Sequence, residues 1–345
     1  MPNFYPFSNV NPNIGSILTL GSGYDPVSGS SMGDCVEASD ARKVHDGQSS
    51  VYGELNYVED YRSLAESLSI SSSINLKIGI PGFSSSVNGS ANFFKSQKIE
   101  ENAVYFMVKV VVESPVEKMR GVQLKEQYAA LLRGPGGIKS FRKRCGDEYV
   151  RGIQRGGTFY ALVKITTRSE EDKRNFQQKL QIKVGKYLTG ARSMQTALDE
   201  IVKDHSVAFY IFQEGGLIPQ IPFSVDNITP VFEHAERFAE NINATGGGAL
   251  IRSITEPYDL LDNYPVEVLP IELENAQQVI ESLSTNRYSS LDAISKIENI
   301  IDHPYNYIFT SDTEQKLNFA RDQYVTNLQI INKFAVQCFR DYEKM

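Results

Sequence analysis

An alternation of apolar and polar residues is the most informative pattern in the sequence. From Leu64 to Ile80 the apolar residues stand at even positions, and Ser, Asn, Lys or Gly fills the odd positions from Ser67 onward. The alternation resumes after the turn pair Pro81-Gly82. A period of two is that of an extended strand with two different faces, whereas a helix repeats about every 3.6 residues. The pattern predicts two strand arms joined by a turn, with an apolar row of Leu64, Leu68, Ile70, Ile74, Leu76, Ile78, Ile80, Phe83, Val87, Ala91 and Phe93.

Such a hairpin has two interpretations, because a half-buried hairpin of a soluble sheet and a hairpin that spans a bilayer both need this alternation. Length distinguishes them. Fully extended, the arm from Leu64 to Ile80 spans roughly 55 Å at about 3.3 Å per residue. This exceeds the ~30 Å of bilayer hydrocarbon and is long for an ordinary strand. The length favours an insertable hairpin.

Other segments are predicted by composition and spacing. Residues 103–113 form the strongest strand candidate, a nearly unbroken run of Val, Tyr, Phe and Met. Further strands are expected over residues 51–61, 159–167 and 206–212. The spacing of Ile138, Phe141, Cys145 and Tyr149 predicts a helix before the third of these four strands, and residues 123–133 predict another helix.

A second candidate insertable segment, residues 169–205, lies between the third and fourth expected strands. Leu180, Ile182 and Val184 belong to its apolar row and alternate with polar residues. The match is poorer than in the first segment, because the spacing from Met194 to Val202 is helical. This weaker alternation keeps a non-inserting interpretation open.

Between the predicted helix and the third strand lies Cys145-Gly-Asp-Glu-Tyr149, followed by six residues and Gly156-Gly157. This stretch resembles the signature of the membrane-attack-complex/perforin (MACPF) family, which is related to the cholesterol-dependent cytolysins. That signature reads aromatic, Gly, Thr or Ser, His, aromatic, six residues, Gly-Gly. The matching residues are Gly146, Tyr149, Gly156 and Gly157, whereas Cys145, Asp147 and Glu148 depart from it. The segment Leu20-Gly-Ser-Gly-Tyr24 is similar to another found near the start of many family members.

The resemblance implies an α+β fold with a bent, twisted four-stranded antiparallel sheet flanked by two helical clusters, plus a C-terminal helical extension. Residues 1–275 would form the MACPF-like domain, with an irregular lead-in at 1–50, membrane-inserting segments at 62–102 and 169–205, and a closing strand at 264–270. In the family the first such segment is helical before insertion, so helices are expected there in the resting protein. Residues 276–345 would be helical, and the apolar stripe after residue 314 is expected to pack on its own domain rather than on a partner.

Composition and charge exclude several classes. The 345 residues are 41% hydrophobic and carry a net charge of -7, which argues against general nucleic-acid binding. We expect no signal peptide, because residues 1–8 lack a basic and an apolar region, and no apolar run reaches the ~20 residues of a membrane-spanning helix. Three cysteines make a disulfide scaffold unexpected. The four histidines lack zinc spacing and no catalytic motif is present, so no enzyme, metal or cofactor is expected.

The sequence therefore predicts a protein released as a soluble monomer that acts at a target-cell membrane. It would assemble there into a ring or arc of copies and insert two amphipathic β-hairpins per subunit to form a large β-barrel pore. Its implied partners are lipid, further copies of the chain and a receptor or partner protein. The alternatives are a non-lytic MACPF-like membrane-binding or adhesion module and a soluble scaffold that uses the C-terminal helices.

Overall fold

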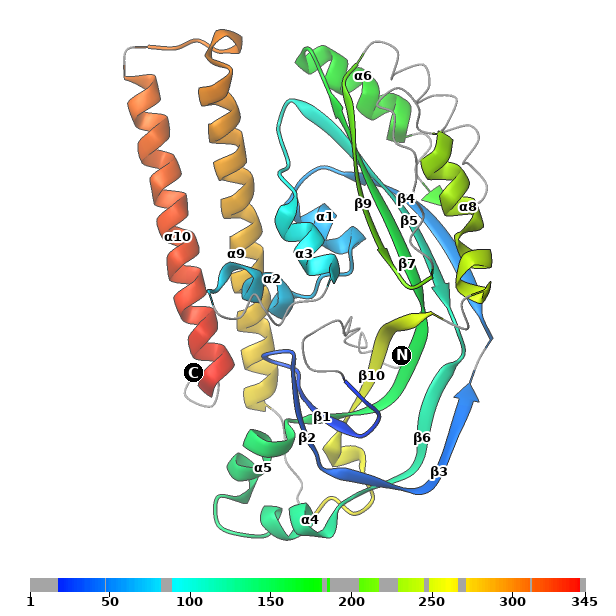
Figure 1. Ribbon diagram of the computed structural model, residues 1–345. Helices are drawn as coiled ribbons and strands as arrows, with labels where there is room; N and C mark the ends of the chain where they lie inside the picture. Colours follow the sequence, from blue (N-terminus) through cyan, green and yellow to red (C-terminus); the bar gives the residue numbers. More distant parts are fainter. Residues whose placement is uncertain are drawn as a thin grey trace, which may run out of the picture.

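The computed structural model describes residues 18–46, 48–81, 89–181, 185–186, 205–216, 229–244, 248–265, 271–310 and 312–341. Its centre is a sharply bent antiparallel sheet (Figure 1). One strand, β7 (Glu148–Thr166), runs through both halves of this sheet. The other strands end near the bend, so β7 connects the two halves.

Each half of the sheet, on either side of the bend, contains four main strands. In one half the order is β4 (Ser50–Val58), β5 (Ala103–Glu113), β7 and β9 (Val207–Glu214). In the other half the order is β3 (Val36–Asp46), β6 (Val116–Leu124), β7 and β10 (Ala249–Pro257). A short hairpin, β1 (Ser22–Asp25) and β2 (Ser30–Asp34), pairs with β7 at Tyr149, and β8 (Gly185–Lys186) pairs with β4. The predicted bent, four-stranded antiparallel sheet is confirmed.

Helices cover both faces of the half that contains β9. On one face lie α1 (Tyr61–Ser67), α2 (Ser72–Gly79) and α3 (Gly89–Ser96), with the long helices α9 (Ile271–Asp302) and α10 (Thr313–Asp341) outside them (Figure 1). On the other face lie α6 (Glu170–Gln181) and α8 (Thr229–Ala244). The helices α4 (Glu126–Leu132) and α5 (Gly137–Cys145) lie at the far end of the other half, and the short 3-10 helices are η2 (Tyr258–Leu260) and η3 (Pro304–Asn306). The two helical clusters and the helical C-terminal region are as predicted.

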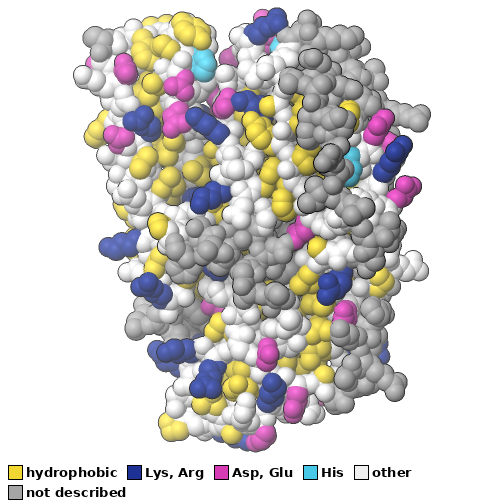
Figure 2. All heavy atoms as spheres, viewed as in Figure 1, with side chains coloured by type: hydrophobic (Ala, Val, Ile, Leu, Met, Phe, Trp, Pro, Cys, Tyr) yellow, Lys and Arg dark blue, Asp and Glu magenta, His cyan; other side chains and the backbone are white. Residues whose placement is uncertain are grey.

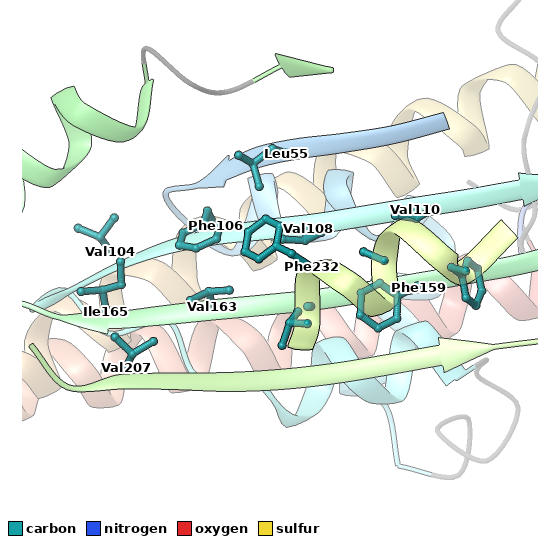
Figure 3. Packing of buried hydrophobic residues seen from close by; sticks show 14 of the residues in the cluster. Leu55, Val104, Phe106, Val108, Val110, Phe159, Val163, Ile165, Val207 and Phe232 are labelled. Atoms are coloured by element: carbon teal, nitrogen blue, oxygen red, sulfur yellow. The ribbon is translucent and has the colours of Figure 1, made fainter. Parts of the chain in front are cut away.

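The core explains why β5 has so unbroken an apolar sequence. Its even-numbered residues, such as Phe106, pack with Phe159 of β7 and Phe232 of α8 (Figure 3). Phe238 of α8 belongs to the same cluster. Its odd-numbered residues, such as Met107, pack on the opposite face with α1, α2 and α3. A strand buried on both faces needs apolar side chains at every position rather than at alternate ones.

Several predicted details were wrong. The lead-in is not irregular between residues 22 and 46, which form β1, β2 and β3; β3 joins the sheet through main-chain pairing with β6 and carries mainly polar residues. The predicted helix ends at Cys145, so Tyr149 lies in β7, and the glycine pair stands in the middle of that strand rather than at its start. Tyr264 and Pro265 are not in a strand, and residues 266–270 lie outside the described ranges. Instead β10 pairs with β7 in that half of the sheet.

The expectation that the cysteines form no disulfide scaffold was also wrong. Cys35 and Cys145 form a disulfide with a Cα–Cα distance of 5.8 Å across 110 residues of sequence, while Cys338 is free and buried. An odd cysteine count does not prevent two of them from pairing once the fold brings them together. The bond ties the start of β3 to the end of α5.

Candidate functional site

The described part of the first candidate segment contains the helices α1, α2 and α3, as the family resemblance implied. Local capping favours this state: Asp60 and Ser63 form a capping box at α1, and the Ser71 hydroxyl accepts a hydrogen bond from the Ile74 amide at the start of α2. In a helix the alternating row divides between two sides. Ile74 and Ile78 pack toward β5 and α3, whereas Leu76 and Ile80 pack against α9 and α10.

The remaining residues of the predicted apolar row lie around α2. Leu68, Ile70 and Phe93 are buried in the cluster that faces β5, so every described member of the row is in the core of the resting protein. Phe83 and Val87 lie outside the described residues. The role of this row in a membrane stays a prediction.

Three polar residues of α2 are buried as well. Ser73, Asn75 and Lys77 are 7%, 0% and 2% exposed. Asn75 donates to the Ser284 hydroxyl at 2.9 Å and accepts from the Arg287 guanidinium at 2.6 Å. Both partners belong to α9, more than 200 positions later in the sequence. Burial of a polar residue is tolerated only with such partners.

Among these buried polar residues, Lys77 is the one whose burial costs the most free energy, because its side chain carries a charge. Its ammonium donates to the Ser30 hydroxyl at 3.1 Å and lies 6.0 Å from the centre of the Phe339 ring. Burial lowers the pKa of Lys77 to about 8, an effect that the charge of Asp25 partly offsets. A charged amine in this position therefore works against the helical state.

The helices α9 and α10, which we call the C-terminal helical pair, contact the described part of the first segment at its start, in its middle and at its end. The Asp292 carboxylate accepts from the Tyr61 amide at 3.0 Å at its start, and Lys98 pairs with Glu298 at 3.0 Å at its end. Ser295 also donates to the carbonyl of Ile99. Between these ends, α10 supplies a hydrogen bond from Asn332 to the carbonyl of Gly79 at 2.9 Å. Sequence reasoning missed this arrangement, because the pairing residues are far apart in the chain.

The second candidate segment is described only in part. Residues 170–181 form α6, which places the backbone of Leu180 in a helix, whereas Ile182 and Val184 lie outside the described ranges. Phe176 packs into the core beneath α8, and Gln177 donates to the Tyr57 hydroxyl at 2.6 Å. Lys173 pairs with Glu101 at 3.1 Å. These contacts hold α6 against β4 and the start of β5.

The glycine pair lies at the bend of the sheet. A Cβ at Gly156 would stand 1.9 Å from the carbonyl oxygen of Val112, and one at Gly157 would stand 2.2 Å from Cδ1 of Ile242 in α8. Gly248, which sequence reasoning missed, has φ +80 and a Cβ there would stand 1.9 Å from the carbonyl oxygen of Gly156. The bend therefore depends on close approaches of main chain that any side chain would prevent.

The start of the signature forms a compact joint. Gly146 has φ +77, and a Cβ there would stand 2.2 Å from the carbonyl oxygen of Tyr24. Tyr149 is buried and donates to Glu256 at 2.9 Å. Two of the three residues that depart from the family signature make structural contacts: Cys145 is in the disulfide and Asp147 pairs with Arg142 at 2.7 Å. The third, Glu148, is in a buried setting that raises the pKa of its carboxyl group.

Comparison with known proteins gives similarity at the level of fold. No protein-family model and no curated protein matches the sequence. Among solved structures, stonustoxin aligns over 95% of this chain and 41% of its own, with 12% identity and a TM-score of 0.48. GNIP1Aa from Chromobacterium piscinae aligns over 82% and 58%, with 13% identity and a TM-score of 0.41.

A third similar structure is a protein with a MAC/Perforin domain from Bacteroides thetaiotaomicron, which aligns over 81% of this chain and 63% of its own, with 12% identity and a TM-score of 0.33. The chain spans less than two thirds of the length of each of these three proteins. Within the described ranges, every helix is too short or too polar to cross a bilayer.

Proposed function

We propose that this protein assembles on a membrane and converts its first segment, together with the second, into β-hairpins that form a barrel pore. Residues 62–102 would continue β4 and β5 as one hairpin, and residues 169–205 would continue β7 and β9 as another. We assign no catalytic, cofactor or metal site to the chain. A release of the protein as a soluble monomer and a ring or arc of copies are part of the proposal.

The observation that carries the proposal is the conflict between pattern and structure in the first segment. Its sequence alternates with a period of two, yet residues 72–79 form a helix that buries the apolar residues and also Ser73, Asn75 and Lys77. Alternation is of no use to a short helix that is buried on all sides, whereas it suits a barrel strand with one face on lipid and one on water. The pattern therefore supports a second, extended state.

The geometry of the sheet supports the same conclusion. The last pairs before the segments depart are Val58 with Tyr105, Ala103 with Thr166 and Ile165 with Val207, so the four strands end together. The 41 residues from 62 to 102 would supply arms of about 20 residues, or roughly 66 Å each. That length exceeds the ~30 Å of bilayer hydrocarbon, and closure of a ring of copies would satisfy the strand edges.

The disulfide supports action outside the cytosol. Bonds such as that between Cys35 and Cys145 persist mainly in oxidising compartments. A net charge of -7 is compatible with a protein that stays dissolved before it meets its target. Both features support release from the producing cell.

A disulfide lock tests the mechanism. A Cβ at Gly29 would lie 3.8 Å from the Cβ of Ser73, which is within the usual range for a disulfide. The double variant Gly29→Cys/Ser73→Cys should bond α2 to the turn between β1 and β2. We expect its oxidised form to bind vesicles without releasing dye, and a mild reductant should restore release.

The matched controls are the single variants Gly29→Cys and Ser73→Cys and the natural chain, each with and without reductant, because Cys35–Cys145 is also reducible. Equal dye release by the oxidised and reduced double variant would overturn the insertion of this segment. Vesicles of phosphatidylcholine with and without cholesterol provide the membranes.

A second candidate function is a non-lytic membrane-binding or adhesion module. It is favoured by the complete burial of Asn75 and Lys77 beneath the C-terminal helical pair, since release of α2 would expose all their partners at once. A natural chain that binds membranes and never releases dye from any of them would support this module instead.

A further inference from the structure

The turn between α9 and α10 carries an exposed apolar tip, which we define as Tyr305, Tyr307 and Ile308. Ile308 is 96% exposed and Tyr305 is 80% exposed, whereas most large apolar residues of the described chain are buried. Figure 2 shows hydrophobic side chains gathered over this end of the helical pair. Single exposed apolar residues are ordinary, but three within four positions on a protruding turn need an explanation.

Hydrogen bonds lie on both sides of the tip, whose Tyr305 and Ile308 side chains are exposed. Asn299 donates to the Tyr307 hydroxyl at 3.0 Å, and the His303 ring lies 3.1 Å from the carbonyl oxygen of Asn299. On the other side, Thr310 bonds to Asp312 and Thr313 at the start of α10. A surface whose conformation is already fixed loses little entropy on binding.

The position of the tip indicates what it meets. Glu298 contacts Lys98 and Ser295 contacts Ile99, next to the start of β5. From Glu298 to Asp302 α9 rises about 6 Å further, so the tip projects beyond the end of the sheet. This is the end at which β4, β5, β7 and β9 stop together (Figure 1). If the segments insert from these ends, the tip reaches the same membrane.

We propose that this tip is a membrane anchor that inserts Tyr305 and Ile308 into the interface of a bilayer with neutral headgroups. Tyrosine rings favour the boundary between headgroups and hydrocarbon, and isoleucine favours the hydrocarbon itself. The neighbouring charges are mainly acidic, with Asp302, Asp312 and Glu314 exposed against Lys316. Acidic neighbours disfavour an anionic surface. The inference rests on the proposed function only for the side on which the membrane lies. The exposure of the tip is independent of that function.

A small convex tip suits a lipid surface better than a protein. A stable protein interface removes about 800 Å² from each partner, far more than three side chains on a turn can provide. A bilayer offers a continuous apolar layer into which single side chains can be buried. The occupant to which the observations point is therefore lipid rather than a second protein.

Flotation with phosphatidylcholine vesicles tests the anchor with the full chain. We expect Ile308→Asp to weaken binding roughly tenfold or more, and Ile308→Trp to strengthen it. Both changes are at an exposed position, so circular dichroism and the melting temperature should stay unchanged. The matched control is Leu260→Asp, which places the same charge on a residue that is 68% exposed at the opposite end of the sheet, and it should bind like the natural chain.

The outcomes separate this anchor from the pore. Three results would overturn the anchor. They are an Ile308→Asp chain that binds as well as the natural one, a Leu260→Asp chain that loses as much binding as Ile308→Asp, and tighter binding to vesicles that contain equal parts of phosphatidylcholine and phosphatidylserine. Binding to cells but not to protein-free vesicles would overturn it in favour of a receptor, and a change in the size of the free protein would overturn it in favour of a second copy. Binding that depends on Ile308 without dye release would support the anchor and contradict the pore.

Discussion

The helices α2 and α6 belong to the two segments predicted to insert, and the structure holds them very differently. Of the eight residues of α2, six are buried, including Asn75 and Lys77. Among the described side chains of α6, only Phe176 is buried. α2 lies between the sheet and the C-terminal helical pair, while α6 lies on the outer face of the sheet (Figure 1).

This difference teaches that two segments with the same predicted role can be held in the structure by contacts of very different extent. The polar residues of α2 have partners in α9 and α10 that must be given up together, whereas α6 gives up a few half-exposed contacts. Under the proposed function, release of α2 from the C-terminal helical pair is the more demanding step.

The largest effect is expected at Arg287. Arg287→Ala removes a buried donor to Asn75 and leaves a cavity under α2, so the free energy of opening α2 should fall by roughly 3 kcal/mol. Hydrogen exchange at the amides from Ile74 to Lys77 measures this opening. The matched control is Arg174→Ala on α6, an exposed arginine whose loss should change stability by less than about 0.5 kcal/mol. Similar effects at the two arginines would contradict the comparison.

A smaller change in the stability of α2 is expected from the charge on Lys77, and it should depend on pH. Its pKa is lowered to about 8, against about 10.4 when unfolded. Between these values the unfolded chain binds more protons than the folded one, so stability rises with pH in this window and is lowest below about 8. The gain is about 3 kcal/mol at most, since one pKa unit is about 1.4 kcal/mol.

Hydrogen exchange of α2 at a series of pH values, corrected for the intrinsic exchange rate, checks this direction. Lys77→Met should remove the pH dependence and stabilise α2 near neutral pH, because it fills a similar volume without a charge. Amides of α6 in the same samples should lack this trend. A pH response that persists in Lys77→Met would assign it to another group.

The smallest effect is expected at Gln177 of α6. Gln177→Ala removes the hydrogen bond to the Tyr57 hydroxyl, and the opening free energy of α6 should fall by about 1 kcal/mol. Gln178→Ala, at the exposed neighbouring position, serves as the control and should have no measurable effect. A larger loss at Gln177 than at Arg287 would reverse the ranking of the two helices.

Much of the fold could be predicted because it depends on local pattern. The apolar runs at 51–61, 103–113, 159–167 and 206–212 predicted β4, β5, the second half of β7 and β9 close to their observed bounds. The glycine pair marked a position where a sheet can bend, and the structure places both glycines at the bend. The stripe after residue 314 was expected to pack on its own domain, and Ile331, Ala335 and Cys338 do so.

Other features depend on residues that meet only in the folded chain. The disulfide joins positions 110 apart, and Arg287 reaches Asn75 from 212 positions away. The periodicity of a local stretch cannot predict contacts between residues so far apart in the sequence. β3 was missed because main-chain pairing holds an edge strand in a sheet even when its sequence is largely polar. β10, which pairs with β7, was missed as well.

The sequence by itself determined the period of the first segment, because alternation is a property of neighbours along the chain. It also determined the order of the two segments relative to β4, β5, the second half of β7 and β9, and it marked the glycine pair. Contacts in the tertiary structure, together with the local caps at Asp60 and Ser71, hold this segment as helices, since the partners of Asn75 and Lys77 come from distant α9, β2 and α10. A pattern that specifies an extended strand is held in another form by contacts that no local stretch of sequence contains.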